Sequence, residues 1–518
     1  MAAIISDQFR ILNAETFIKS FSSIGSTYYT FIGQPNSTNP SAYGITNWGE
    51  GPPPLDGFKE ETEIKETILT LKNITPSDIR RVVRKTPWVA GRTYDMYRHD
   101  YSIYNPTPVT KQPSLYEANY YVINEDLRVY ICLQNGSSPD SPNGKPSLDE
   151  PNFVDLEPRP AGSSGDGYIW KYLYTIKPSE IFKFDSIEFI PVPDNWGIVG
   201  DTAATKENAV DGKIDIVVIK NPGGDYSPTS RTYKNIPILG DGENGKVSIT
   251  INSFGKVSEI FVTDGGTGYT KGIIKFQPGA PGIPPELTNS TDNFAEFDVI
   301  IPPKGGHGYD IYRELGAYRV LIYTRFVTDE SNPDTILGND FARVGIIKNP
   351  TTYGSDVNLL TQAEVSGLKS LKLSGITSNT VYPVDGIITQ TIGTGKTAIG
   401  FAASWNDITG VLKYYQPVGL ANSTVDYKIY NFTSSPTGTG SLIINGASIG
   451  NNLSINTGFN GVTTVINNRT YQLGSNFVSG ISNEEYNKKS GEIIYIDNRS
   501  AIPRTSSQKE DIKIVLEF

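Results

Sequence analysis

The segment that most resembles a reactive loop is residues 393–397, with the sequence Gly-Thr-Gly-Lys-Thr. Phosphate-binding loops use such glycines to expose backbone N–H groups, and a lysine to contact the phosphates. The full motif also needs a glycine five residues before the Gly-Lys pair, where this chain has Gln390. Residues 398–403 lack the apolar stripe of a helix. We therefore expect a glycine-rich β-turn here and no nucleotide site.

Residues 446–450, Gly-Ala-Ser-Ile-Gly, match the nucleophile elbow of serine hydrolases. A hydrolase of that kind takes its histidine from a position later in the chain than the serine. The only histidines, His99 and His307, both precede Ser448. This order excludes the elbow interpretation.

The sequence also offers little for metals or for acid–base chemistry. Two histidines and Cys132 cannot supply the usual zinc ligands. Residues 241–245, Asp-Gly-Glu-Asn-Gly, place oxygens at alternate positions as calcium loops do, but lack the later ligands. The 55 acidic residues could contain a glycosidase pair, although nothing singles one out. We expect no catalytic, cofactor-binding or metal-ligating residues, no cofactor and no small-molecule substrate, hence not an enzyme.

Composition predicts a mainly β protein. The 518 residues include 51 Gly, 34 Pro, 30 Tyr and 21 Phe, which is typical of short strands joined by tight turns. A net charge of −10 disfavours nucleic acid as a partner. The single cysteine, Cys132, fits a reducing cytosol. Because we find no signal peptide and no apolar run long enough for a bilayer, we expect a protein made inside a cell without a membrane partner.

Two short helices are expected near the beginning of the chain. Asn13 can cap the first, since apolar residues recur at helical spacing up to residue 21. The second is expected from Thr75, because Pro76 suits a first turn and Asp78 favours a helix start. Its basic run at positions 80, 81, 84 and 85 is interpreted as a solvated or partner-facing surface.

Two changes in composition divide the rest of the chain. From residue 201, apolar strands run twice into a Gly-Gly turn followed by tyrosine, at 223–226 and at 265–269. Between Lys428 and Arg469 there is no charged residue, and Asn, Ser, Thr and Gly dominate. We expect strands at 120–123, 129–133, 168–176, 214–219, 260–262, 318–326, 344–348, 442–446, 462–467, 492–496 and 511–518.

These patterns predict a mainly β protein with a few short helices and two inserted small β domains. The insertions would divide the rest of the chain into three parts, at 1–200, 301–352 and 481–518. The insertions would be 201–300, with the Gly-Gly-Tyr repeats, and 353–480, rich in Asn, Ser and Gly.

Six segments together resemble one known family. They are Phe9-Arg10 to Trp48 with Ser-Ile-Gly-Ser at 23–26 and Thr-Phe-Ile-Gly at 30–33; Arg84, Trp88, Gly91-Arg92 and Tyr94; Val-Tyr-Ile-Cys-Leu at 129–133; Gly-Asp-Gly-Tyr-Ile-Trp-Lys-Tyr-Leu at 165–173; residues 341–350, ending in Ile-Ile-Lys-Asn-Pro; and Ser-Gly-Glu-Ile-Ile-Tyr-Ile-Asp-Asn-Arg at 490–499. In this order they resemble the dimeric β-sandwich wedge protein of T-even-type contractile phage baseplates. The resemblance covers roughly 1–200, 301–352 and 481–518, and it implies that these three parts form one Greek-key-like β-sandwich core.

The resemblance implies a structural subunit of the virion, assembled in the cytoplasm of a bacterial host. It would be a homodimer in each wedge of the tail baseplate, bound to other wedge proteins and transmitting the conformational change of infection. The family carries no catalytic residues. The resemblance does not extend to 201–300 or 353–480, so whether either insertion binds glycan or calcium stays open.

Two other functions compete with this interpretation. A carbohydrate-binding tail adhesin, or fibre-attachment protein, is suggested by the aromatic, uncharged second insertion, where Tyr414 and Tyr415 could stack on sugars if exposed. Burial of these two tyrosines in a strand is the alternative. Only the number of acidic residues supports the third function, a polysaccharide depolymerase.

Overall fold

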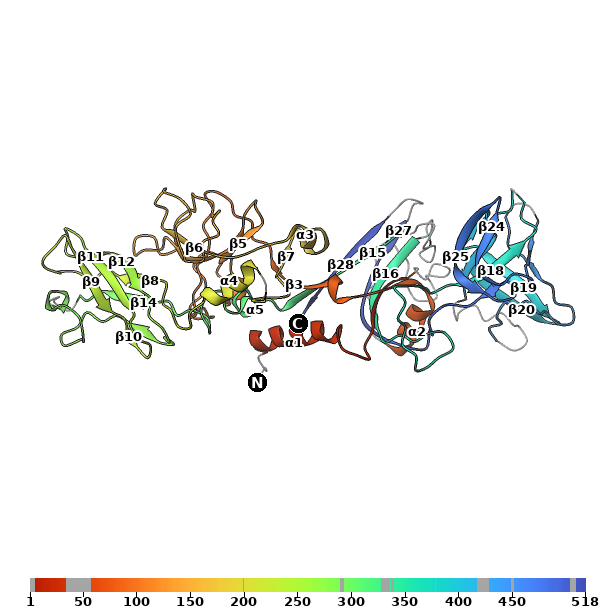
Figure 1. The fold of residues 1–518 in the computed structure, drawn as a ribbon, viewed down its shortest axis with the longest axis horizontal. Coiled ribbons are helices and arrows are strands. Elements are labelled where there is room, and N and C mark those ends of the chain that lie inside the picture. Colours follow the sequence, from red (N-terminus) through yellow and green to blue (C-terminus); the bar gives the residue numbers. More distant parts are fainter. Residues whose placement is uncertain are drawn as a thin grey trace. The chain divides into compact units, whose positions relative to one another are not determined.

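A computed structural model describes residues 5–33, 57–198, 200–288, 293–327, 336, 340–377, 379–416, 428–448, 451–503 and 509–518. It is 39% strand and 11% helix, so the predicted mainly β class with a few short helices is confirmed (Figure 1). The chain forms two compact units. Unit 1 comprises Met1–Thr16, Arg80–Leu321 and Val515–Phe518, and unit 2 comprises Phe17–Ile79 and Ile322–Ile514. Trp48, part of the family resemblance, lies outside the described residues.

Unit 2 contains a five-stranded antiparallel sheet assembled from distant parts of the chain. Its order is β17-β2-β1-β16-β27. The strands are β1 (Tyr28–Gly33), β2 (Ile68–Asn73), β16 (Asp340–Lys348), β17 (Glu364–Ser366) and β27 (Glu492–Pro503). Every residue of β1 is buried, as expected for a central strand covered on both faces.

The second sheet of unit 2 has the order β19-β20-β21-β18-β23-β22, with β26 also paired to β18. Its strands are β18 (Lys369–Ser374), β19 (Ile387–Gly393), β20 (Lys396–Asn406), β21 (Val411–Tyr415), β22 (Ile443–Ile444), β23 (Leu453–Ile455) and β26 (Ile481–Ser482). A separate hairpin joins β24 (Gly461–Ile466) to β25 (Arg469–Phe477). One hydrophobic cluster here draws its buried members only from residues 371–455.

Unit 1 is built around a three-stranded sheet, β4-β5-β6, with an aromatic core. The strands are β4 (Tyr121–Ile123), β5 (Arg128–Asn135) and β6 (Tyr168–Thr175). Trp170 lies fully buried in β6, stacked on Tyr168 with ring centroids 5.3 Å apart. Because large rings contribute much buried area each, this small sheet still supports a large core.

Residues 214–299 of unit 1 supply all buried members of another hydrophobic cluster. They form the sheets β12-β11-β9, β10-β13 and β14-β8. The strands are β8 (Val217–Asn221), β9 (Arg231–Pro237), β10 (Leu239–Gly240), β11 (Lys246–Ile251), β12 (Val257–Asp264), β13 (Gly272–Ile273) and β14 (Glu296–Val299). Both repeat tyrosines, Tyr226 and Tyr269, are buried in this cluster. The repeat glycines Gly223 and Gly266 adopt positive φ, a conformation that glycine takes without strain.

A four-stranded sheet of order β28-β15-β3-β7 completes the strands. It contains β3 (Ile79–Arg84), β7 (Phe189–Pro191), β15 (Arg319–Phe326) and β28 (Glu510–Glu517), and the boundary between the units falls inside β15 and β28. The helices are α1 (Asp7–Ser20), α2 (Phe58–Glu66), α3 (Pro178–Phe184), α4 (Asp201–Asn208) and α5 (Ile311–Glu314), with 3-10 turns at η3 (Pro76–Asp78), η4 (Leu115–Glu117) and η5 (Pro285–Thr288).

Both helix predictions need correction. The first helix, α1, begins at Asp7, so Asn13 lies inside it rather than at its cap. The second prediction is wrong: the capping box of Thr75 and Asp78 is present, but it closes only the 3-10 turn η3. The residues that follow form strand β3, whose Val82 and Val83 pair with β7. Pairing with a distant strand therefore overrides the local helix signal.

Candidate functional site

The glycine-rich segment at 393–397 is the turn of a hairpin. Strands β19 and β20 pair up to Gly393 and Lys396, and only Thr394 and Gly395 lie between them. Gly395 has φ +68°, a conformation that glycine adopts without strain. The β-turn prediction is confirmed.

The serine of the elbow-like segment is engaged with the backbone. The Ser448 hydroxyl donates to the Val381 carbonyl at 3.3 Å. Residues 449 and 450 of that segment lie outside the described residues. His99 and His307 belong to unit 1, whereas Ser448 belongs to unit 2.

The Asp241 carboxylate, the first oxygen donor of the calcium-like loop, accepts hydrogen bonds from residues 270 and 271. Its Oδ1 accepts from the backbone N–H groups of Thr270 and Lys271, each at 2.9 Å, and Oδ2 accepts from the Thr270 hydroxyl. These bonds, led by that of the Thr270 side chain, lower the pKa of Asp241 to about 2. Within the described ranges, no three His, Cys, Asp or Glu side chains gather as a metal site would need.

His307 lies in a buried polar contact of unit 1. Its Nδ1 is 2.6 Å from Oε1 of Glu314, whose side chain is fully buried. The second oxygen of Glu314 accepts from the Gly308 N–H at 2.7 Å, and the ring of Tyr97 packs edge-on against the imidazole. The contact ties the 304–309 loop to α5.

The basic run at positions 80, 81, 84 and 85 is half-buried in unit 1, which corrects the expectation of a solvated surface. Arg80 pairs with Glu180 at 2.9 Å, and Lys85 pairs with Asp185 at 2.8 Å. Arg81 lies over the Tyr312 ring, 3.8 Å from its centroid. Because these cations already have partners within unit 1, they offer little to an external polyanion.

The tyrosines considered for sugar stacking are buried. Tyr414 and Tyr415 in β21 are 1% and 4% exposed. Tyr414 packs against Phe432 with ring centroids 4.8 Å apart. The alternative of burial in a strand is confirmed, which removes these two residues as a basis for the adhesin.

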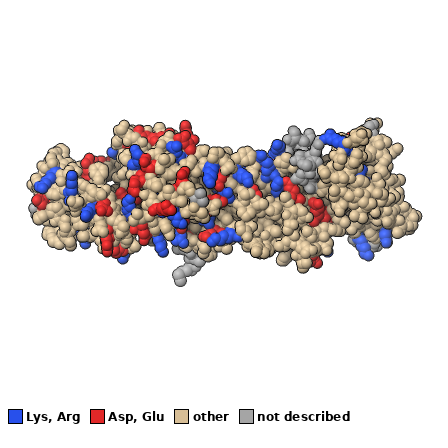
Figure 2. All heavy atoms as spheres, in the orientation of Figure 1, with Lys and Arg blue, Asp and Glu red and all other residues tan. Residues whose placement is uncertain are grey.

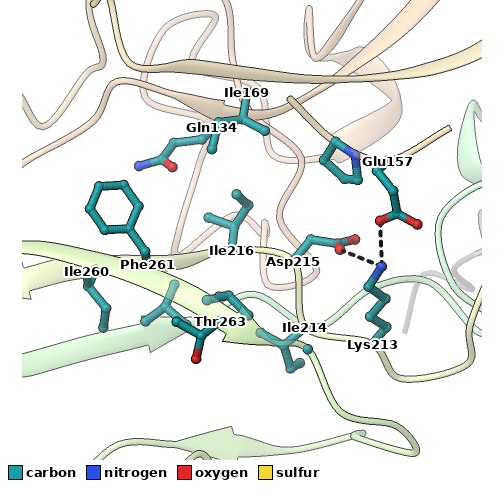
Figure 3. Close-up of a pocket in the computed structure, with 14 residues that line it drawn as sticks. Gln134, Glu157, Ile169, Lys213, Ile214, Asp215, Ile216, Ile260, Phe261 and Thr263 are labelled. Atoms are coloured by element: carbon teal, nitrogen blue, oxygen red, sulfur yellow. Dashed lines mark hydrogen bonds and ion pairs between the residues drawn. The ribbon is translucent and has the colours of Figure 1, made fainter. Parts of the chain in front are cut away.

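A cleft of about 320 Å³ in unit 1 was not predicted (Figure 3). One wall comes from the sheet β4-β5-β6 and the loop before β6, and the other from the 213–217 segment and β12. Figure 3 shows Gln134 and Phe261 on one side of the cleft, and Glu157, Lys213 and Asp215 on the other. The wall residues lie far apart in the sequence without a common spacing, so no motif marks them.

The charged end of the cleft is an asymmetric ion-pair group. Lys213 Nζ is 2.8 Å from Oε2 of Glu157 but 3.9 Å from Oδ1 of Asp215. Burial lowers the Lys213 pKa, but the hydrogen bond with Glu157 and the charge of Asp215 outweigh it and raise the pKa overall. The hydrogen bond from Lys213 likewise lowers the pKa of Glu157. Both groups are therefore charged at neutral pH, and Lys213 is no candidate nucleophile.

A second lysine lies behind this group. Lys171 of β6 is almost fully buried and donates to the carbonyl of Leu156 at 2.7 Å. It also donates to Asn208 of α4 at 3.3 Å, and Asn208 donates to Glu157. Burial lowers the Lys171 pKa, which the charge of Asp215 partly offsets. The two lysines and two carboxylates balance in formal charge.

Segments that resemble the wedge family lie together in the five-stranded sheet. Strand β16 lies between β1 and β27 and pairs with both. These three strands hold the resembling segments at 30–33, 341–350 and 490–499. At the centre, Gly345 faces Phe31 on one side and Ile496 on the other. Two further resembling segments, in β5 and β6, are also neighbours.

The comparisons with known proteins identify no family. No family model matches the chain, and no curated protein is similar to it. None of the helices in the described ranges combines the length and the apolar character that a bilayer crossing requires.

Proposed function

We propose that the chain is a structural subunit of a contractile phage tail, a homodimer in the baseplate wedge that binds other wedge proteins. The observation that carries this proposal is the adjacency of β1, β16 and β27. Their family-like segments are separated by about 300 and 150 residues, yet they form one continuous stretch of sheet. Accidental matches would have no reason to meet in this way.

Exposed apolar side chains support a role in assembly. Ile103 and Tyr104 are 76% and 95% exposed at the tip of a tight turn. Reciprocal backbone hydrogen bonds between Ser102 and Asn105, of 3.0 and 3.1 Å, close this turn. Large apolar groups presented on a fixed backbone suit protein contacts, because little conformational entropy is lost on binding.

The distribution of charge also suits packing among neighbours. Figure 2 shows acidic and basic side chains intermingled over unit 1, while the surface over β18–β25 is largely uncharged on the face shown. Residues 429–468 contain no charged side chain. Surfaces without charge bury in an interface at a smaller desolvation cost than charged ones.

Electron microscopy of contractile tails labelled with antibody against this chain tests the location. The proposal predicts label at the baseplate, the end of the tail away from the head. Label confined to fibre tips would favour the adhesin, and absence of label from the tail would contradict the proposal.

A further inference from the structure

The cleft between the β5–β6 wall and the 213–217 and β12 wall contains groups that the fold itself does not use. Phe261, on the exposed face of β12, is 59% exposed and makes no ring contact with any described residue. The side-chain amide of Gln134 likewise makes no hydrogen bond within the described chain. An aromatic face and a free amide thus meet at one side of the cleft (Figure 3).

Asp215 also lines the cleft, and its carboxylate has no hydrogen-bond donor among the described residues. Its side chain is only 12% exposed, and Lys213 Nζ, at 3.9 Å, lies beyond hydrogen-bond distance. No described residue donates a hydrogen bond to it. The Asp215 carboxylate therefore keeps acceptor capacity for a donor from outside the chain.

The charged residues at the cleft disfavour the binding of a charged ligand. Lys213 at the cleft and Lys171, which is buried and does not line it, offset the charges of Glu157 and Asp215. A ligand cation would gain little from carboxylates whose charge is already offset, and a ligand anion would meet the Asp215 carboxylate. A neutral ligand that donates hydrogen bonds avoids both costs.

We propose that this cleft binds a neutral saccharide unit, with a C–H face of the sugar on the Phe261 ring and its hydroxyl groups donating to Asp215 and bonding to Gln134. Ile169 and Ile216 complete an aliphatic surface beside the ring. A volume of about 320 Å³ is at the lower end for small-molecule sites, which suits one or two sugar rings. The inference goes beyond the assembly role and does not depend on it.

Saturation-transfer NMR on the full chain tests this directly. The probes are glucose, galactose, mannose and N-acetylglucosamine, with glucuronate as an anionic probe and N-acetylarginine amide as a cationic one. We expect saturation transfer to at least one neutral sugar and none to the charged probes. Transfer to no neutral sugar, or stronger binding of a charged probe, would overturn the proposal.

Two variants then locate the site. Phe261→Ala and Asp215→Asn should each raise the Kd of the bound sugar about tenfold, a change of about 1.4 kcal/mol. Phe254→Ala is the matched control, since Phe254 is 83% exposed on the β11–β12 turn and does not line the cleft. Unchanged thermal unfolding would show that the variants are folded. A sugar affinity that survives both substitutions would assign the binding elsewhere and refute this site.

Discussion

Gly345 of β16 faces Phe31 of β1, and a Cβ atom added to Gly345 would collide with Cζ of that ring. The same Cβ would lie 2.6 Å from the carbonyl oxygen of Tyr495 in β27. The central strand of the family-like sheet therefore needs glycine where its two neighbours approach.

Substituting Gly345→Ala should destabilise unit 2. Because backbone and a buried ring would have to move, we expect the free energy of unfolding to fall by about 2 kcal/mol, measured by chemical denaturation. Gly458→Ala is the control, since a Cβ there would meet only the Asn456 side chain at 3.6 Å, an ordinary contact. Equal stability of the two variants would show that β1, β16 and β27 do not pack as described.

Glu314→Ala should be among the more damaging changes in unit 1. It leaves the Gly308 N–H and His307 without their acceptor in a buried site, at a cost of about 3 kcal/mol. The control is Glu296→Ala, which removes an exposed carboxylate from β14. Thermal unfolding of both variants measures the difference in their stability. A similar small effect in both would argue that Glu314 is solvated.

Asp241 should make the 201–300 region sensitive to acid. Its folded pKa of about 2 lies below the ordinary 3.8, so the carboxylate stabilises the fold at pH values above about 4. This stabilisation is lost as the pH falls through about 2. We expect Asp241→Asn to unfold at a lower temperature than the parent at pH 7, with the gap closing toward pH 2. A gap that does not change with pH would contradict the hydrogen bonds to Thr270 and Lys271.

The hairpin of β24 and β25 can be stabilised at its turn. Asn467 and Asn468 both have positive φ, +50° and +61°, as a type I′ turn requires. Asn468→Gly should therefore raise the free energy of unfolding by roughly 0.5–1 kcal/mol, because glycine adopts this conformation without steric cost. Asn468→Ala should lower it. Chemical denaturation of both variants checks the sign, and the opposite order would rule out the turn.

Strands were predictable from the sequence where alternation and aromatic content coincide. The segment at 168–176 is β6, and the segment at 318–326 is β15, each within one residue at either end. The turn at Gly395 was also predictable, since glycine marks the positive φ that the hairpin needs. These features depend on local conformational preferences.

The features that the sequence did not predict depend on contacts with distant parts of the chain. The residues after Thr75 have helical spacing, yet β7, about a hundred residues away, pairs with them as a strand. The cleft is hidden for the same reason, because Gln134, Asp215 and Phe261 come together only through the tertiary fold. No spacing within one segment could identify it.

The solution mass of the purified chain tests the central claim, a dimeric assembly subunit, most directly. Light scattering coupled to size exclusion should give a mass near twice the 56.6 kDa of one chain. A mass near three times that value would indicate a fibre-like trimer, and would contradict the wedge-subunit proposal.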